Sequence, residues 1–235
     1  MVKFTEPFDT IDPAKWAIWT GAGTLNKYEI VNGRLHCQSL FEGYNGYIVL
    51  SSTKPYLMMN NGVEIEFEMA KTSVGFIALS IAPYNIRRGQ PLYVLRNYDA
   101  ILFRIDHLGN HTVDFWNARG GVVSVQRIPV SSDIFSGKLA IRNRNRENSF
   151  FFNGQKFGSI SELPNMNTAI FVVAEPMGGY TPGVVDVYVD NLTIEDISIG
   201  MLSEQWVGFL NLMMVVIMMS VISSIIKQVK KVREK

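Results

Sequence analysis

The chain has 235 residues with 22 Lys or Arg and 21 Asp or Glu, which gives a formal net charge of +1. Five of the bases and one of the acids fall in residues 227–235, so residues 1–226 carry 17 bases and 20 acids. Phosphate binding needs a concentrated basic surface, and this balance excludes a nucleic-acid-binding role for the main part of the chain. The single cysteine, Cys37, excludes an internal disulfide and lies in an alternating segment typical of a buried thiol.

Residues 28–194 consist of short β-branched and aromatic runs separated by turn residues. Asn32-Gly33 stands between two alternating segments and predicts a β-hairpin. Further strands are expected at residues 46–51, 62–70, 74–82, 91–95, 99–106, 112–117, 121–128, 138–143, 148–152, 155–160, 168–174 and 184–194. This spacing predicts one all-β domain, residues 1–196, built as a two-sheet sandwich.

Five segments occur in an order that resembles the concanavalin A-like superfamily. They are FTEPFDTIDPAKW, YEIVNGRLHC, NNGVEIEFEMA, RENSFFFNGQKFGSI and VVDVYVDNLTIED. That superfamily includes laminin-G-like modules, legume-type lectins and lichenase- or laminarinase-type β-glucanases. The resemblance covers nearly all of residues 4–196 and implies a jelly-roll sandwich.

Glu64, Glu66 and Glu68 alternate along one expected strand. Retaining β-glucanases place two carboxylates about 5 Å apart, and alternating acids on one strand are one way to do so. In the order of the resemblance, however, residues 98–106 occupy the place of the glucanase catalytic strand and lack the triplet of acids. We therefore expect the three glutamates on an exposed sheet face, without a hydrolytic role.

A ligand-binding face is expected on residues 98–106 and 112–116. Alternation places its candidate residues on one side: Tyr98, Arg104, Asp106, Asp114 and Trp116. If the intervening turn sets Asp106 opposite Thr112, Arg104 faces Asp114, with Trp116 one step further. An aromatic plane beside an Arg/Asp pair suits a sugar, because the ring covers the apolar C–H face while the charged groups bind hydroxyls. The alternative is an ordinary solvated sheet face with a cross-strand ion pair.

A structural calcium ion is a further implication of the resemblance. The matching positions are Asp190, Gly33 and the stretch around Phe8 and Asp9. Calcium takes six to eight oxygen ligands, so one certain carboxylate does not define a site. No other cofactor is expected.

Residues 206–226 form an uncharged apolar run of 21 residues. As a helix they would reach about 32 Å, which matches a hydrocarbon core of about 30 Å. The sequence thus predicts a linker at 197–205, a single transmembrane helix at 206–226 and a basic tail at 227–235. The residues expected at the membrane interface are Trp206, Lys227, Lys230, Lys231, Arg233 and Lys235.

Three functions are compatible with these patterns. The leading hypothesis is a membrane-anchored, non-enzymatic, lectin-like surface domain that binds glycans, mediates adhesion or assembles with neighbouring surface proteins. The alternative is a structural membrane protein of a virion, with the sandwich packed in the particle shell and the basic tail facing the genome, because the N-terminal residues contain no secretory signal. The third is a β-glucanase-like hydrolase that uses Glu64 and Glu68. The first two imply a single-pass protein at a cell surface or in a virion membrane, with its tail cytoplasmic or virion-interior.

Overall fold

The computed structural model describes residues 2–6, 8–21, 25–41, 46–57, 61–84, 97–161, 167–177 and 183–196. All regular elements in these ranges are β-strands. The strands are β1 (Val2–Glu6), β2 (Trp16–Thr20), β3 (Lys27–Val31), β4 (Arg34–Leu40), β5 (Ile48–Ser52), β6 (Tyr56–Leu57), β7 (Gly62–Met69), β8 (Gly75–Pro83), β9 (Tyr98–Ile105), β10 (His111–Arg119), β11 (Val122–Pro129), β12 (Ser136–Arg144), β13 (Glu147–Phe152), β14 (Gln155–Ser161), β15 (Asn167–Pro176) and β16 (Val184–Asp196).

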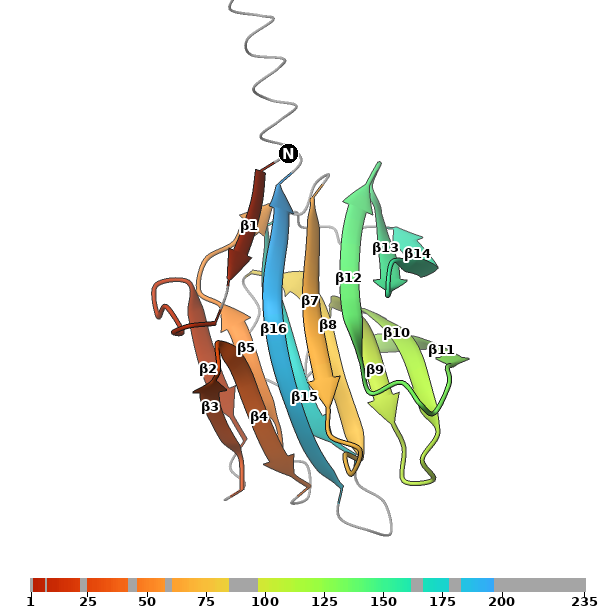
Figure 1. Cartoon of the computed structure of the whole chain (residues 1–235). Coiled ribbons are helices and arrows are strands. Elements are labelled where there is room, and N and C mark those ends of the chain that lie inside the picture. Colours follow the sequence, from red (N-terminus) through yellow and green to blue (C-terminus); the bar gives the residue numbers. More distant parts are fainter. Residues whose placement is uncertain are drawn as a thin grey trace, which may run out of the picture. The chain divides into compact units, whose positions relative to one another are not determined.

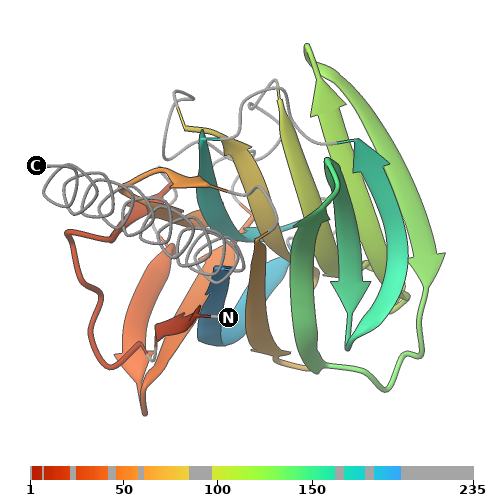
Figure 2. The same cartoon turned by 90° about the horizontal axis from the view of Figure 1, so that it is seen from above.

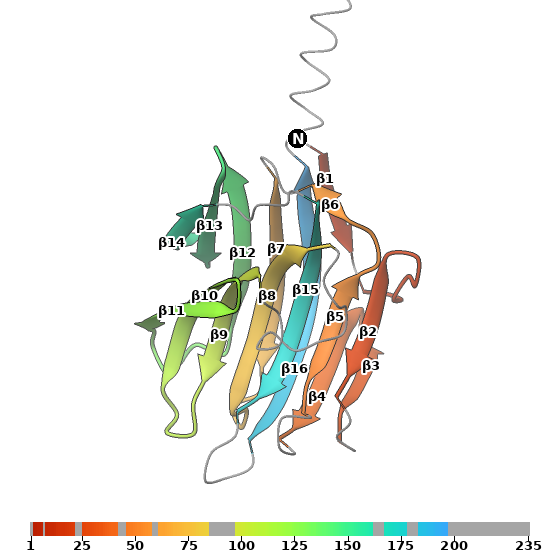
Figure 3. The same cartoon turned by 180° about the vertical axis from the view of Figure 1, so that it is seen from behind.

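The strands form two sheets that lie face to face (Figures 1 and 3). Sheet A has the order β14-β13-β12-β7-β16-β4-β3, with β1 also paired to β16. Sheet B has the order β11-β10-β9-β8-β15-β5-β2, with β6 also paired to β15. The central pairs β7–β16, β8–β9 and β8–β15 are antiparallel. The prediction of an all-β, two-sheet jelly-roll sandwich is confirmed.

The main core lies between the sheets and follows the period of two along each strand. On β4, Leu35 and Cys37 point inward while the residues between them are partly exposed. On β9, Ile101, Phe103 and Ile105 are the inward residues. Burial raises the pKa of the Cys37 thiol to about 12, so this thiol is a packing group, as expected.

A second apolar cluster covers the outer face of sheet B. Its residues alternate with those of the main core: Val49, Phe76, Ala78, Ala82, Tyr98, Ala100, Leu102, Ala118, Ala169, Phe171 and Val173. As a result β8 is buried at all nine of its positions. A strand buried on both faces reads as a continuous apolar run, which explains the sequence GFIALSIAP.

Two Asn-Gly turns connect adjacent strands of sheet A. Asn32 and Gly33 have φ values of 51° and 75° and join β3 to β4, with Val31 paired to Arg34. Asn153 and Gly154 join β13 to β14 with φ values of 49° and 79°. Both residues of a two-residue type I′ turn need positive φ, which Asn and Gly adopt most readily. The hairpin predicted at Asn32-Gly33 is confirmed.

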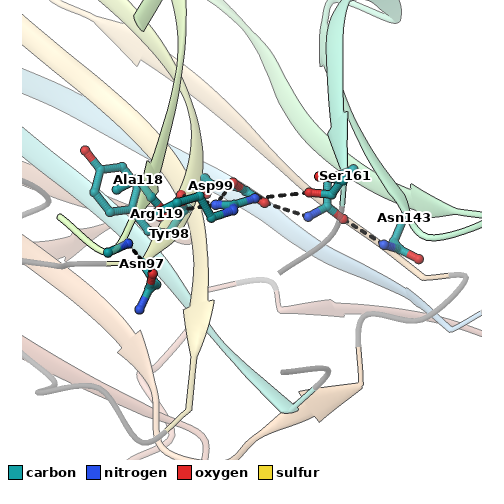
Figure 4. A network of polar contacts seen from close by, with 10 residues as sticks. Asn97, Tyr98, Asp99, Ala118, Arg119, Asn143 and Ser161 are labelled. Atoms are coloured by element: carbon teal, nitrogen blue, oxygen red, sulfur yellow. Dashed lines mark hydrogen bonds and ion pairs between the residues drawn. The ribbon is translucent and has the colours of Figure 1, made fainter. Parts of the chain in front are cut away.

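A buried polar network joins the two sheets (Figure 4). Asp99 on β9 is fully buried and accepts hydrogen bonds from Arg119 Nη1 and Asn148 Nδ2, both at 2.7 Å. Asn148 on β13 in turn accepts from Asn143 Nδ2 at 2.8 Å, and Arg119 Nη2 donates to the Ser161 carbonyl at 3.1 Å. Burial raises the pKa of Asp99 above its ordinary value, against the opposing effect of these hydrogen bonds. Figure 2 shows the strands involved, with β12–β14 beside β9–β11.

Residues Lys3–Asp196 form one compact unit. Within the described ranges, no helix has the length and apolar character needed to cross a bilayer. The predicted linker, transmembrane helix and basic tail at residues 197–235 lie outside the described residues, as does the strand expected at 91–95. The interface residues Trp206, Lys227, Lys230, Lys231, Arg233 and Lys235 therefore stay predictions.

Candidate functional site

The three glutamates of β7 lie on the outer face of sheet A, as predicted. Glu64, Glu66 and Glu68 are partly exposed or exposed and alternate with buried residues. They form ion pairs with basic side chains of other strands: Lys138 with Glu64 and Glu66, Arg142 with Glu64, and Arg34 with Glu68. The sandwich core separates them from the outer face of sheet B. All three carboxylates thus form ion pairs on the outer face of sheet A, and the absence of a hydrolytic role for Glu64 and Glu68 stays a prediction.

The outer face of β9 carries no carboxylate among its described residues. Ala100, Leu102 and Arg104 point outward, whereas the one acid of this strand, Asp99, points into the core network. Any carboxyl group on the outer face of sheet B must therefore come from another strand of the sheet. Two strands supply one each: β10 and β15.

The first acid is Asp114 on β10, which is shared by two arginines. Arg127 Nε on β11 donates to both carboxylate oxygens of Asp114, at 3.2 and 3.1 Å. Arg104 Nη1 lies 3.9 Å from Asp114 Oδ2, and Trp116 Nε1 donates to the same oxygen at 3.4 Å. Arg104, Asp114 and Trp116 are thus brought together, as predicted. Arg127 also belongs to this group but was not predicted, because the spacing of the charges does not reveal that β10 pairs with β11.

The predicted register of β9 against β10 is wrong by two residues. Thr112, expected opposite Asp106, pairs with Arg104, and Asp114 pairs with Leu102, so Arg104 reaches Asp114 diagonally. The reason is the turn itself. Asp106 accepts hydrogen bonds from the backbone N–H groups of Leu108 and Asn110, at 2.8 and 2.9 Å, and so closes the loop instead of joining the site.

The second acid is Glu175 on β15, which the sequence analysis missed. It pairs with Phe76 on β8, which pairs with Arg104 on β9, so Glu175 and Arg104 lie in one row on the same face. Burial raises the pKa of Glu175 to about 8. Its buried Oε2 atom has no hydrogen-bond partner in the described part of the chain. Glu175 is therefore a protonated acid at neutral pH.

An aromatic surface lies between these two acids. Trp116 is partly exposed and packs against Phe76, with ring centroids 5.8 Å apart and planes tilted by 56°. Tyr98, at the other end of β9, is fully buried, and its hydroxyl has no partner among the described residues. Burial raises the pKa of Tyr98 to about 12, with a further contribution from the Glu175 charge.

Of the residues implied for calcium, Asp190 and Gly33 lie near each other. Val189 pairs with Leu35, which sets Asp190 close to the turn that holds Gly33. Asp190 Oδ1 accepts the Asn191 N–H at 2.7 Å, so part of its capacity is already used. In the ranges that the structure describes, no group of three or more His, Cys, Asp or Glu side chains could hold a metal ion. One carboxylate does not fit the charge and ligand number that calcium requires, and no step below depends on it.

Comparison with solved structures shows that this sandwich is similar in fold to several β-glucanases. An endo-β-1,3-glucanase from Pyrococcus furiosus has a TM-score of 0.62 at 14% identity, over 81% of this chain and 92% of that one. The catalytic domain of a laminarinase from Thermotoga petrophila has a TM-score of 0.59 at 17% identity, over 83% and 97% of the two chains. A Bacillus licheniformis β-glucanase has a TM-score of 0.56 at 13% identity, over 83% and 98%. No family model and no curated protein sequence matches the chain.

These neighbours correct the leading hypothesis of the sequence analysis. At this level of identity the likeness concerns the fold, and the three neighbours named above are glucan-hydrolysing enzymes. The prediction of a non-enzymatic, lectin-like surface domain is therefore wrong, as is the prediction that the chain is not an enzyme. The comparison does not support the alternative of a structural virion protein. The expected partners (lipid bilayer, surface or capsid proteins, nucleic acid at the tail) and the membrane location stay predictions.

Proposed function

We propose that the protein is a glucanase-like glycoside hydrolase that binds its polysaccharide across the outer face of sheet B, with Glu175 as the proton donor. The observation that carries this proposal is the position of the Glu175 carboxyl group, which lies on that face with a buried oxygen that has no hydrogen-bond partner among the described residues; burial raises its pKa to about 8. Glycoside hydrolysis needs an acid that is still protonated at working pH to protonate the leaving oxygen. Among described residues, Glu175 is the carboxyl group with the largest upward shift and a free oxygen.

The other carboxyl group on this face is that of Asp114, which forms an ion pair with Arg127. Adjacent strands lie about 4.8 Å apart, so the backbones of β10 and β15, three strand steps from each other, are about 14 Å apart. Retaining enzymes place their carboxyl groups only about 5–5.5 Å apart, whereas inverting enzymes leave room for a water molecule. The separation of the two backbones exceeds the roughly 5–5.5 Å of retaining enzymes and also the roughly 6.5–9.5 Å of inverting enzymes, so the geometry does not assign Asp114 as the second catalytic carboxylate.

The sugar-binding surface is the ring of Trp116, which is partly exposed and offers an apolar face for the C–H side of a pyranose. The buried ring of Phe76 packs against Trp116 and supports it. The solved neighbours are described as endo-β-1,3-glucanases, laminarinases and a lichenase. We take β-1,3- and β-1,3-1,4-glucans as the first substrates to test.

The test is release of reducing sugar from these two glucans by the full chain and by Glu175→Gln. Glutamine keeps the shape of the protonated acid but cannot donate the proton, so the rate should fall by about 100-fold or more. Glu68→Gln on the outer face of sheet A is the matched control and should keep the wild-type rate. The wild-type rate should also decline as the pH rises through about 8, where Glu175 loses its proton. Absence of hydrolysis by the wild type, or an unchanged rate in Glu175→Gln, would refute the proposal.

A further inference from the structure

Two arginines on the outer face of sheet B approach the same buried carboxylate. Arg104 and Arg127 share the single carboxylate of Asp114. Asp114 is completely buried, and Arg127 uses only its Nε atom in the hydrogen bonds to it. Arg127 thus takes the hydrogen bonds of Asp114, whereas Arg104 lies 3.9 Å from this carboxylate and keeps donors that suit the oxygens of a further anion.

Two buried polar groups beside this pair have no partner in the described residues. They are the Nε–H group of Arg104 and the hydroxyl of Thr112. The two residues pair directly across β9 and β10, and Thr112 is only 8% exposed. A buried donor without an acceptor costs free energy comparable to a lost hydrogen bond. Two such donors side by side therefore define a place for a ligand with several acceptor oxygens.

The remaining charged groups near Arg104 do not supply those oxygens. Asp106 is occupied by the turn, where both of its oxygens accept from the side-chain amide of Asn110. Glu175 lies in the same row as Arg104 but is uncharged below a pH of about 8. Burial lowers the pKa of Arg104, and the neighbouring Arg127 lowers it further, against the opposing effect of the Asp114 and Asp106 charges.

We propose that Arg104, Arg127 and Thr112 form a subsite for an anionic substituent of the polysaccharide, a uronate carboxylate or a sulfate ester. The subsite rests on the proposed function, because it lies on the same face and adjoins Trp116, which bonds to Asp114. A sugar ring stacked on Trp116 would present its substituent toward the arginines. The substrate class is then an acidic polysaccharide.

The experiment measures the affinity of the full chain for three oligosaccharide sets: neutral laminari-oligosaccharides, oligoglucuronates and sulfated laminari-oligosaccharides. Thr112→Val keeps the shape of the side chain but removes the hydroxyl, and Arg104→Lys keeps the charge but removes the Nε–H. Each variant should lower the preference for acidic over neutral oligosaccharides by about tenfold. Arg142→Lys on the outer face of sheet A is the control and should keep the preference. If the two variants lose more affinity for oligoglucuronates, the substituent is a carboxylate. If they lose more affinity for the sulfated laminari-oligosaccharides, the substituent is a sulfate ester.

A wild-type protein without preference for either acidic set, or variants that keep the preference, would overturn the subsite. The proposed hydrolytic function is judged separately by Glu175→Gln, which leaves the arginine pair in place. Loss of acidic preference in Thr112→Val together with no hydrolysis would retain the subsite and reject the enzyme. Hydrolysis by a wild-type protein that shows no preference for acidic oligosaccharides would retain the enzyme and reject the subsite.

Discussion

Glu175, the proposed proton donor, should also make the free energy of unfolding depend on pH. Its pKa is about 8 in the folded protein against 4.5 for an ordinary glutamate. The folded chain holds a proton that the unfolded chain releases, so the free energy of unfolding should fall as the pH rises from about 4.5 to about 8. The slope from this residue is at most about 1.4 kcal/mol per pH unit.

Urea denaturation of the wild type and of Glu175→Gln at pH 5 and pH 8 would measure this effect. Glutamine cannot ionise, so the variant should lose that share of the pH dependence and be the more stable protein at pH 8. Glu68→Gln should retain the wild-type slope. Equal slopes in wild type and Glu175→Gln would contradict the assignment of the protonated state.

Of the residues on the outer face of sheet B, the sequence predicted those of one hairpin and missed those of the other strands, for a physical reason. Alternation along β9 and β10 was enough to group Arg104, Asp114 and Trp116, since neighbours on one hairpin face are set by a period of two. Glu175 and Arg127 reach the same face from β15 and β11. The positions of β15 and β11 follow from the order of strands in the sheet, and the residues of these two strands do not reveal that order. A lone acid after the apolar run TAIFVVA was the one available signal for Glu175.

Strand β14 is an element whose position depends on one missing side chain. Gly158 pairs with Phe150, whose ring stacks on Phe115 of sheet B with centroids 5.2 Å apart. A Cβ atom at Gly158 would lie 2.5 Å from the Phe115 ring. Phe115 is buried and has little room to move. The backbone of β14 can therefore approach sheet B only because residue 158 is glycine.

Gly158→Ala should destabilise the fold by about 1–3 kcal/mol, the usual cost of overpacking a dense core. Chemical denaturation measures the change. Gln155→Ala, at an exposed position of the same strand, should have an effect below about 0.5 kcal/mol. A Gly158→Ala protein as stable as the wild type would mean that β14 packs more loosely than described.

Elements were predicted better than the pairing between them. The Asn32-Gly33 hairpin and the outward face of the three β7 glutamates are confirmed, because turn chemistry and alternation act over a few residues. The β9–β10 register was wrong because Asp106 has a second use, as the acceptor that closes its own turn. A short polar residue at a strand end can serve either the strand or the turn, and spacing alone does not distinguish the two.

For the whole molecule, the Asp99 network is the main polar connection between the sheets among the described residues. Arg119→Ala would leave the Asp99 carboxylate buried without its charged partner, at a cost of up to about 3 kcal/mol, since Arg119 is partly exposed. Adding Asp99→Asn should restore much of the loss, because the amide needs no counter-charge. A denaturation series on both variants would measure this, and equal stability of the single and double variants would argue against a charge effect.

The burial of β8 on both faces has a consequence for how the sandwich opens. An amide hydrogen exchanges with solvent only when its segment unfolds locally, and the free energy of that event is highest where strands are covered on every side. Backbone amides of β8 and β9 should thus be the last to take up deuterium, whereas β11, exposed at nearly every position at the edge of the same sheet, should exchange early. Sheet B would then loosen from the β11 edge inward, and the arginine bound to Asp114 from β11 would be released before the strands on which the sugar-binding face is built.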